Sequence, residues 1–357
     1  MSIGAGSLGG VSVGIGTDAT PLLFSGEAYL VPWLPEFWFG VVAFTLAAYV
    51  LLDGFDFGIG ILYPLSRNEH ERETLLSVFG PVWDANEVWL VAFGTVLLGA
   101  FPPVYARLLS DNYLLAIAIV LALLFRGVSA ELREQRDDED WKRIWDLSFV
   151  AGSVLSPFLI GMLVGSWLFA SGAASLPSLL VGVLVVALSA TLGSAYLGLK
   201  TRGDLRERFA RHGRNAAVVY LGAVVVGLAV LLAIDAGNLR SAAFTASVLA
   251  PVLATVAFGI ATPVFAQRRA FRAWFVAAAG LAASLAGLVA ALLYPTIYPL
   301  ANLTVREAVV SPIPLNLLTV LGVPALLMVL AYFTYLYRVF QGPVAVGGDG
   351  GYGVGDD

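Results

Sequence analysis

Two carboxylates interrupt an apolar run at residues 51–60, which read LLDGFDFGIG. Asp53 and Asp56 are three residues apart, so they share one face if this stretch is helical. Gly54 and Gly58 form a G-x-x-x-G pair beside the two acids, and this spacing allows a second helix to approach closely. The stretch therefore predicts a helix that buries an acidic face against its neighbours.

The composition around this stretch predicts an integral membrane protein. Of the 357 residues, 59% are hydrophobic and 13% are charged, whereas soluble domains carry about 25% charged residues. A membrane-spanning helix needs about 20 apolar residues, and we find nine such runs. They cover residues 36–63, 75–101, 112–132, 146–171, 178–199, 215–235, 241–267, 271–295 and 313–340. We expect an all-α, polytopic bundle of about nine transmembrane helices.

The ends of the chain differ from this bundle in composition. Residues 1–33 are rich in Gly, and their first thirty positions lack Lys and Arg, so a secretory signal pattern is missing. We expect a flexible, uncleaved extension there, a transmembrane domain over 34–340, and a flexible, acidic, Gly-rich tail over 341–357. The weakest separation between runs lies at 171–178, where a kinked or re-entrant segment would change the count.

The distribution of basic residues predicts the orientation. Sixteen of the 20 Lys and Arg residues fall in the loops after odd-numbered runs or near the C-terminal end, and three fall on the opposite side. Short cytoplasmic loops of membrane proteins carry an excess of Lys and Arg. We therefore expect a multi-pass protein of the cell membrane with its N-terminus outside and its C-terminus in the cytoplasm.

Metal and nucleic-acid sites are not expected in this chain. Cysteine is absent, and the two histidines, His70 and His212, lie in charged stretches. Neither histidine is placed to bind a metal at membrane depth. We find no nucleotide-binding glycine loop after a strand and no nucleic-acid module.

Five ionisable side chains from the first three runs are expected in the cytoplasmic half of the membrane, at a helical rise of about 1.5 Å per residue. They are Asp53, Asp56, Asp84, Glu87 and Arg126. Each costs about 2.5–3.5 kcal/mol if it faces lipid, so we expect them to point inward. There they would contact one another or water.

Two interpretations of this polar cluster remain open. In the first, Arg126 neutralises one acid, the others are protonated or hydrogen-bonded, and the cluster is structural. In the second, the acids relay protons, because closely placed carboxylates cannot all ionise. Arg126 would then set the local potential, since arginine does not release its proton. Four acids against one base favour the proton path, although Asp53 could serve only as a hydrogen-bonding partner. Asn86 and Trp83 add hydrogen-bonding capacity beside Asp84.

Several motifs together resemble subunit II of cytochrome bd-type quinol oxidases. The two most specific are LDGFDFGIG at 52–60 and GPVWDANEVWL at 80–90. The others are RNEHER at 67–72, LLFRGVSAELR at 123–133, WKRIWD at 141–146, AYLGLKTRGDLRERF at 195–209 and LYPTIYPLANLTV at 293–305. The resemblance covers the chain from about residue 36 to 340, and nine spans match the family fold.

The resemblance implies a function in aerobic respiration. The family couples quinol oxidation to the reduction of dioxygen to water with b- and d-type haems, or b-type haems alone. The resemblance implies that these haems lie in subunit I. This chain would then be the non-haem partner, which contributes a cytoplasmic proton pathway. The lack of a histidine at membrane depth agrees with this. Some members also bind a structural quinone, for which no motif is found here.

The resemblance also suggests roles for individual residues. Asp56 matches the second acid of the family's DGFD motif, Asp84 the acid of its WDGN motif, and Arg126 the arginine that follows an apolar Phe. These positions lie along the family's proposed proton route. Trp89 matches a tryptophan near a proposed oxygen passage. The chain departs from the common pattern with Ala85 in place of Gly and with Glu87 where some relatives carry Gln.

Two other classes of function remain as alternatives. A proton-coupled secondary transporter would use the same acids as a coupling site. Against it, we find no Gly- or Pro-broken spans at matching positions in two halves of the chain. A purely structural subunit is the third interpretation.

Overall fold

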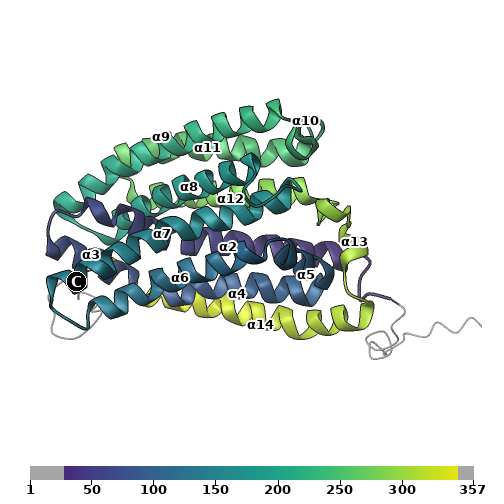
Figure 1. Cartoon of the computed structure of the whole chain (residues 1–357), viewed down its shortest axis with the longest axis horizontal. Helices are drawn as coiled ribbons and strands as arrows, with labels where there is room; N and C mark the ends of the chain where they lie inside the picture. Colours follow the sequence, from purple (N-terminus) through teal and green to yellow (C-terminus); the bar gives the residue numbers. More distant parts are fainter. Residues whose placement is uncertain (1–27, 345–357) are drawn as a thin grey trace, which may run out of the picture.

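The computed structural model describes residues 28–344, and its regular elements are helices. The long helices are α2 (Leu34–Leu62), α4 (Trp83–Ala100), α6 (Tyr113–Arg133), α7 (Glu139–Leu168), α8 (Leu176–Lys200), α9 (Gly203–Ala233), α11 (Ala246–Gln267), α12 (Phe271–Leu293) and α14 (Pro312–Val339). The shorter helices are α3 (Glu69–Phe79), α5 (Pro102–Asp111), α10 (Leu239–Ala242) and α13 (Val305–Ala308). Three 3₁₀ turns lie at Tyr63–Leu65, Ala236–Asn238 and Pro299–Ala301. Figure 1 shows the long helices side by side, with α3 at one end of the bundle and α5, α10 and α13 at the other.

The predicted fold class, an all-α polytopic membrane protein, is confirmed. Within residues 28–344, eight helices are long and apolar enough to cross a membrane. The ninth long helix, α4, has 18 residues and begins with the polar sequence WDANE. Because of these polar first turns, α4 offers no 18-residue stretch as apolar as those of the other eight helices. The predicted number of about nine transmembrane helices therefore agrees approximately with the eight candidate spans and the ninth long helix.

The predicted run at 75–101 is not one helix. The turn at Gly80–Val82 separates α3 from α4, and Pro81 lies within it, where a proline cannot continue the helical hydrogen-bond ladder. As a result, Asp84 and Glu87 lie in the first two turns of α4 rather than in the middle of a span. The weak separation near 171–178 is a true interruption. There the Ser175 side chain accepts a hydrogen bond from the backbone N–H of Ser178 and caps the start of α8.

Helix α2 lies at the centre of the bundle and packs against α4, α7, α8 and α12. Its closest neighbour is α8, because glycines from both helices meet at the crossing. A Cβ atom added at Gly58 would lie 2.0 Å from the carbonyl oxygen of Ser189, and one added at Gly193 would lie 2.3 Å from the Gly58 backbone. At Gly54, a Cβ atom would lie 2.9 Å from a methyl group of Leu192. These glycines bring α8 against one face of α2, whereas Asp53 and Asp56 lie on another face, where their partners come from α6 and α4.

We expect Gly58→Ala to lower the melting temperature of the detergent-purified protein, because the new methyl group must force two backbones apart. Overpacking of this kind costs about 1–3 kcal/mol. Gly40→Ala on the same helix is the matched control, since nothing lies within 4 Å of a Cβ atom there. Equal melting temperatures for the two variants would show that the α2–α8 contact does not require glycine.

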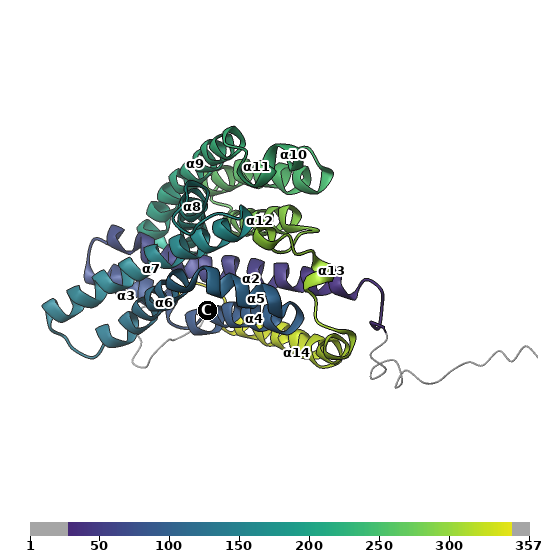
Figure 2. The ribbon, with the colours of Figure 1, turned by 45° about the vertical axis from the view of Figure 1, so that its right-hand side comes forward.

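Helices α9 and α11 pack against each other on one side of the bundle, whereas α4 and α14 lie on the opposite side of α2 (Figure 2). These outer helices keep large apolar side chains exposed, among them Val225 and Val226 on α9 and Leu321 and Met328 on α14. Apolar surfaces of this kind suit contact with lipid or with another membrane-embedded chain.

The short segments before the first long helix and after the last one are held to the bundle by hydrogen bonds. The backbone N–H of Leu30 donates to Oδ1 of Asn316 at 2.9 Å, and the backbone N–H of Val344 donates to the carbonyl of Lys200 at 2.9 Å. Residues 28–33 of the predicted extension and 341–344 of the predicted tail thus pack onto the bundle. The remaining parts of both segments, 1–27 and 345–357, lie outside the described residues.

Candidate functional site

A buried ion pair between α2 and α6 is the centre of the candidate site. Nη1 of Arg126 donates to Oδ1 of Asp53 at 2.6 Å, and both side chains have no exposed area. The guanidinium also lies over the ring of Phe57, 4.5 Å from its centroid. Gly152 of α7 lets that helix pass close by, since a Cβ atom there would lie 2.6 Å from the backbone nitrogen of Arg126. Three helices therefore fix the arginine.

Glu87 adds a second carboxylate to the same guanidinium. Its Oε2 lies 3.5 Å from Nη2 of Arg126, and its side chain is 25% exposed. Glu87 thus connects the buried pair with the outer face of α4. This carboxylate, which departs from the family pattern, is part of the cluster.

Asp56 belongs to a hydrogen-bond chain that joins α2, α4 and α14. Its Oδ2 accepts from Nδ2 of Asn86 at 2.8 Å, and Oδ1 of Asn86 accepts from the hydroxyl of Tyr337 at 2.7 Å. Asp56 and Asn86 are fully buried. The sequence suggested support from Asn86, but nothing near Tyr337 indicated its contact with residues 251 positions earlier.

The expectation that all five ionisable residues face inward is wrong for Asp84. This side chain is exposed, and the described part of the chain offers it no hydrogen bond or salt bridge. Asp84 lies in the first turn of α4, where free backbone N–H groups and the helix dipole stabilise a carboxylate without any partner. The structure therefore brings together four of the five predicted ionisable residues.

The two predicted tryptophans occupy different surroundings. Trp83 stacks on Phe79 with a ring separation of 5.7 Å, and it fills the space above Gly127, next to Arg126 on α6. Trp89 is buried between Phe44 and Phe333, with ring separations of 5.7 and 5.3 Å. Trp83 thus helps to position the helix that carries Arg126, while Trp89 lies in an aromatic layer.

Several buried polar atoms around the cluster make no hydrogen bond to the described residues. They are the hydroxyls of Tyr49, Ser153 and Ser156, Oδ2 of Asp53, Oδ1 of Asp56, and Nε and Nη2 of Arg126. Buried polar groups are hydrogen-bonded in nearly all proteins, to ordered water where protein groups are lacking. The cluster therefore has the hydrogen-bonding capacity to hold water between its charges. Tyr49, one helical turn before Asp53, could have been found from this spacing.

A second charged network lies nearer the α3 end of the bundle. Arg133 donates to Glu69 and to Asp146, at 2.6 Å in both cases, and the Tyr63 hydroxyl donates to Asp146 at 2.5 Å. Burial alone would raise the pKa of Glu69, but the hydrogen bond and charge of Arg133 outweigh it, so this pKa lies below its ordinary value. Tyr63, Glu69 and Asp146 border an open cavity of about 830 Å³.

An aromatic layer separates this network from the buried cluster. The ring of Tyr63 lies 5.4 Å from that of Phe149, which lies 5.0 Å from that of Phe79. The guanidinium of Arg126 lies 5.7 Å above the Phe79 ring. The charged surface and the buried arginine are thus close in space but not joined by hydrogen bonds.

The histidines do not fit a role in binding haem. His70 is exposed in the first turn of α3, and His212 lies among arginines near the start of α9. Within residues 28–344 no group of three or more His, Asp or Glu side chains is arranged to hold a metal ion.

The fold and the cluster define a multi-pass helical membrane protein with ionisable side chains enclosed among its spanning helices. The family model for the cytochrome bd terminal oxidase subunit II matches residues 34–340. The chain belongs to this family, and the resemblance noted in its motifs is confirmed.

Individual relatives agree with this assignment. Cytochrome bd ubiquinol oxidase subunit 2 of Bacillus subtilis is 35% identical over 218 residues, which cover 57% of this chain and 63% of that protein. Cytochrome bd-I ubiquinol oxidase subunit 2 of Escherichia coli K12 is 31% identical over 223 residues, which cover 57% and 59%. The chain thus spans about three fifths of the length of these relatives.

A solved structure shares the fold. A chain from the structure of the bd oxidase of Geobacillus thermodenitrificans superimposes with a TM-score of 0.73 at 19% sequence identity. The match covers 86% of this chain and 98% of that chain. The helical arrangement described above is therefore that of a bd oxidase chain.

Proposed function

We propose that the chain is the non-haem subunit II of a cytochrome bd-type terminal oxidase, which couples quinol oxidation to the reduction of dioxygen to water in the cell membrane. Its partner is a haem-bearing subunit I. Membership in the subunit II family and the names of the ubiquinol oxidase relatives support this function. The exposed apolar faces of α4 and α14 offer membrane-embedded surface for such a partner.

Within that complex, the chain contributes a path for protons. The observation that carries this proposal is the arrangement of Asp53, Asp56 and Glu87 around one arginine. Three ionised carboxylates against a single cation would repel strongly at low dielectric. The cluster therefore holds at least one exchangeable proton, whose position can change among the three acids.

The contacts suggest an order for the path. Asp84 is exposed on the first turn of α4 and Glu87 lies one turn further on the same helix, so the two carboxylates are neighbours. Glu87 contacts Arg126, and Arg126 contacts Asp53. Asp56 is one helical turn from Asp53, at the end of the chain formed by Asn86 and Tyr337. Arg126 sets the local potential, since it cannot release its own proton.

With the proposed orientation, proton uptake through this path would contribute to charge separation across the membrane. The Lys and Arg bias of the loops supports a cytoplasmic α3 end of the bundle and an N-terminus outside. Reduction of dioxygen to water consumes protons, and quinol oxidation releases them. Uptake from the cytoplasm with release outside separates charge across the membrane without a pump.

Copurification tests the proposal. We expect the tagged full chain, extracted from its own membranes, to bring with it a second polytopic chain that absorbs visible light as haem proteins do. The preparation should consume oxygen when a quinol is added. A chain that purifies without haem, and that carries solute against a proton gradient in liposomes, would instead assign it to the secondary transporters.

A further inference from the structure

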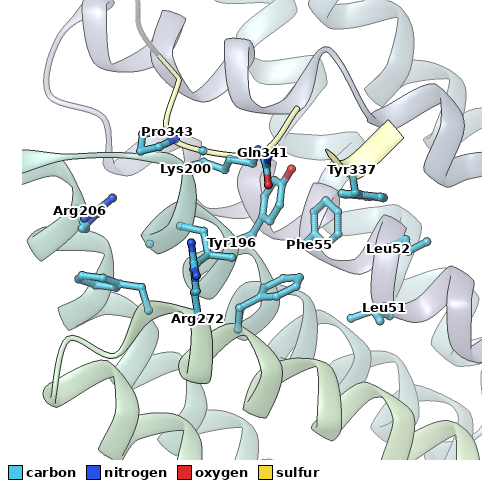
Figure 3. A pocket seen from close by; sticks show the side chains of 15 residues that line it. Leu51, Leu52, Phe55, Tyr196, Lys200, Arg206, Arg272, Tyr337, Gln341 and Pro343 are labelled. Carbon is cyan, nitrogen blue, oxygen red and sulfur yellow. The ribbon is translucent and has the colours of Figure 1, made fainter. Parts of the chain in front are cut away.

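A cavity of about 870 Å³ lies where α8 ends and α9 and α12 begin. Its wall is completed by α2, by the end of α14 and by residues 341–343. The cavity is separate from the buried ion pair and shares only Tyr337 with the hydrogen-bond chain of Asp56. Figure 3 shows Lys200, Arg206 and Arg272 grouped toward one side, with Leu51, Leu52 and Phe55 on the other.

The charged side of the cavity carries three cations and no acid. Lys200, Arg206 and Arg272 line it, and no Asp or Glu does. Across residues 28–344, none of these three cations lies within salt-bridge distance of a carboxylate, although eight other Lys and Arg residues do. Unpaired cations that face one cavity attract an anion.

The positions of two of these cations are fixed by local contacts. Nε of Arg206 donates to the carbonyl of Thr201 at 2.5 Å, and its guanidinium lies 4.7 Å from the centroid of the Phe271 ring. Lys200 is only 8% exposed and donates to the carbonyl of Phe340. One hydrogen bond leaves Lys200 with two further N–H donors, so both cations are held in place with capacity for a ligand.

The first turn of α12 reinforces the same charge preference. This 23-residue helix begins at Phe271 with no side-chain hydrogen bond to cap its first N–H groups. Phe271, Arg272 and Phe275 of its first turns line the cavity. Uncapped N–H groups and the positive end of the helix dipole favour phosphate and other anions. The helix end and the three cations therefore line the same side of one cavity.

The opposite side of the cavity is apolar. Leu51, Leu52 and Phe55 come from the membrane-spanning part of α2, and Phe275 and Tyr337 add aromatic surface. A volume of about 870 Å³ falls within the roughly 300–1,000 Å³ of cavities that enclose drug-sized ligands. A free phosphate ion would fill only a small part of it. The shape and chemistry suit an amphiphile with an anionic head and an apolar tail.

We propose that this cavity binds one phospholipid with a net negative headgroup. The phosphate lies among Lys200, Arg206, Arg272 and the start of α12, and an acyl chain lies along Leu51 and its neighbours. Cytoplasmic leaflets supply anionic lipids, which basic segments at the membrane surface attract. Tyr337 also lines the cavity, so the bound lipid touches the side chain that completes the hydrogen-bond chain to Asp56. The inference does not depend on the oxidase function.

Lipid titration of the delipidated, detergent-purified complex tests the site. We expect phosphatidylglycerol to bind more tightly than phosphatidylcholine with the same acyl chains, as measured by native mass spectrometry. Arg206→Gln combined with Arg272→Gln should weaken phosphatidylglycerol binding about thirtyfold, since each surface cation contributes about a factor of five. The matched control is Arg202→Gln with Arg268→Gln, because both of these arginines are exposed and lie outside the cavity. Arg206→Lys with Arg272→Lys should keep most of the affinity.

Four results would overturn the proposal. The first is equal binding of the two lipids, and the second is an equal loss in the Gln pair and its control. The third is full displacement of phosphatidylglycerol by millimolar inorganic phosphate, which would assign the site to a free anion. The fourth is phosphatidylglycerol binding that appears only after deletion of residues 345–357, which would assign the site to the acidic end of the chain itself.

Discussion

Asp56→Asn is expected to lower quinol-driven oxygen reduction about a hundredfold, while haem content and assembly stay at their normal levels. Asparagine keeps the shape of the side chain, and its Oδ1 can still accept the hydrogen bond from Asn86 that Oδ2 of Asp56 accepts now. It cannot take up and release a proton. Loss of a positioned proton donor or acceptor typically costs a factor of 10²–10⁴. Oxygen uptake by the purified complex and its visible spectrum are the two measurements.

Glu36→Gln is the matched control for this variant. Glu36 lies on the same helix, in its first turn, and pairs with the exposed Arg306 at the other end of the bundle. Its neutralisation should leave oxygen uptake unchanged. Normal turnover in Asp56→Asn would remove Asp56 from the proton path. A loss of haem together with turnover would show that the carboxylate has a structural role instead.

Arg126→Gln is expected to lower the stability of the chain by about 3–5 kcal/mol, because it leaves Asp53 buried without its cation. Both side chains are fully enclosed, so water cannot replace the guanidinium at no cost. The measurements are the yield of assembled complex and its melting temperature in detergent. Arg338→Gln on α14 is the control, since Arg338 is exposed and has no ion-pair partner within residues 28–344.

A double variant separates charge balance from other roles of the arginine. Asp53→Asn combined with Arg126→Gln removes both charges, and we expect it to regain most of the stability that Arg126→Gln loses. Replacement of a whole buried ion pair is often nearly neutral, whereas loss of one partner is not. Equal stability of the single and double variants would contradict the view that the uncompensated Asp53 charge causes the loss.

The sequence was sufficient to predict the spanning helices and the meeting of Asp53, Arg126 and Glu87. Both predictions rest on local quantities, namely the length of apolar runs and depth along a helix. The free-energy cost of a charge in lipid gave the remaining information. An arginine in the middle of an apolar run must point into the bundle, toward acidic side chains. For the same reason, Arg126 was expected to neutralise one of the acids, but the choice of Asp53 became clear only from the packing.

The features that were missed depend on packing or on a local break. Asp84 was placed inward because the run from 75 to 101 was taken as one helix, whereas the turn at Gly80–Val82 makes Asp84 part of a helix start. Tyr337 joins the cluster only because α14 returns to lie against α4. No periodicity in the last run distinguishes Tyr337 from Tyr332 or Tyr335, which are exposed.

The contact between Tyr337 and Asn86 has a consequence for biosynthesis. Asp56 enters the membrane early, but the hydroxyl that closes its hydrogen-bond chain is made 281 residues later, in the last helix. Until that helix inserts, the amide of Asn86 lacks its donor and the acidic face of α2 is incomplete. A nascent chain that stops before α14 therefore exposes an unfinished polar surface within the bilayer. The hydrogen-bond chain of Asp56 is therefore complete only once the final helix has inserted.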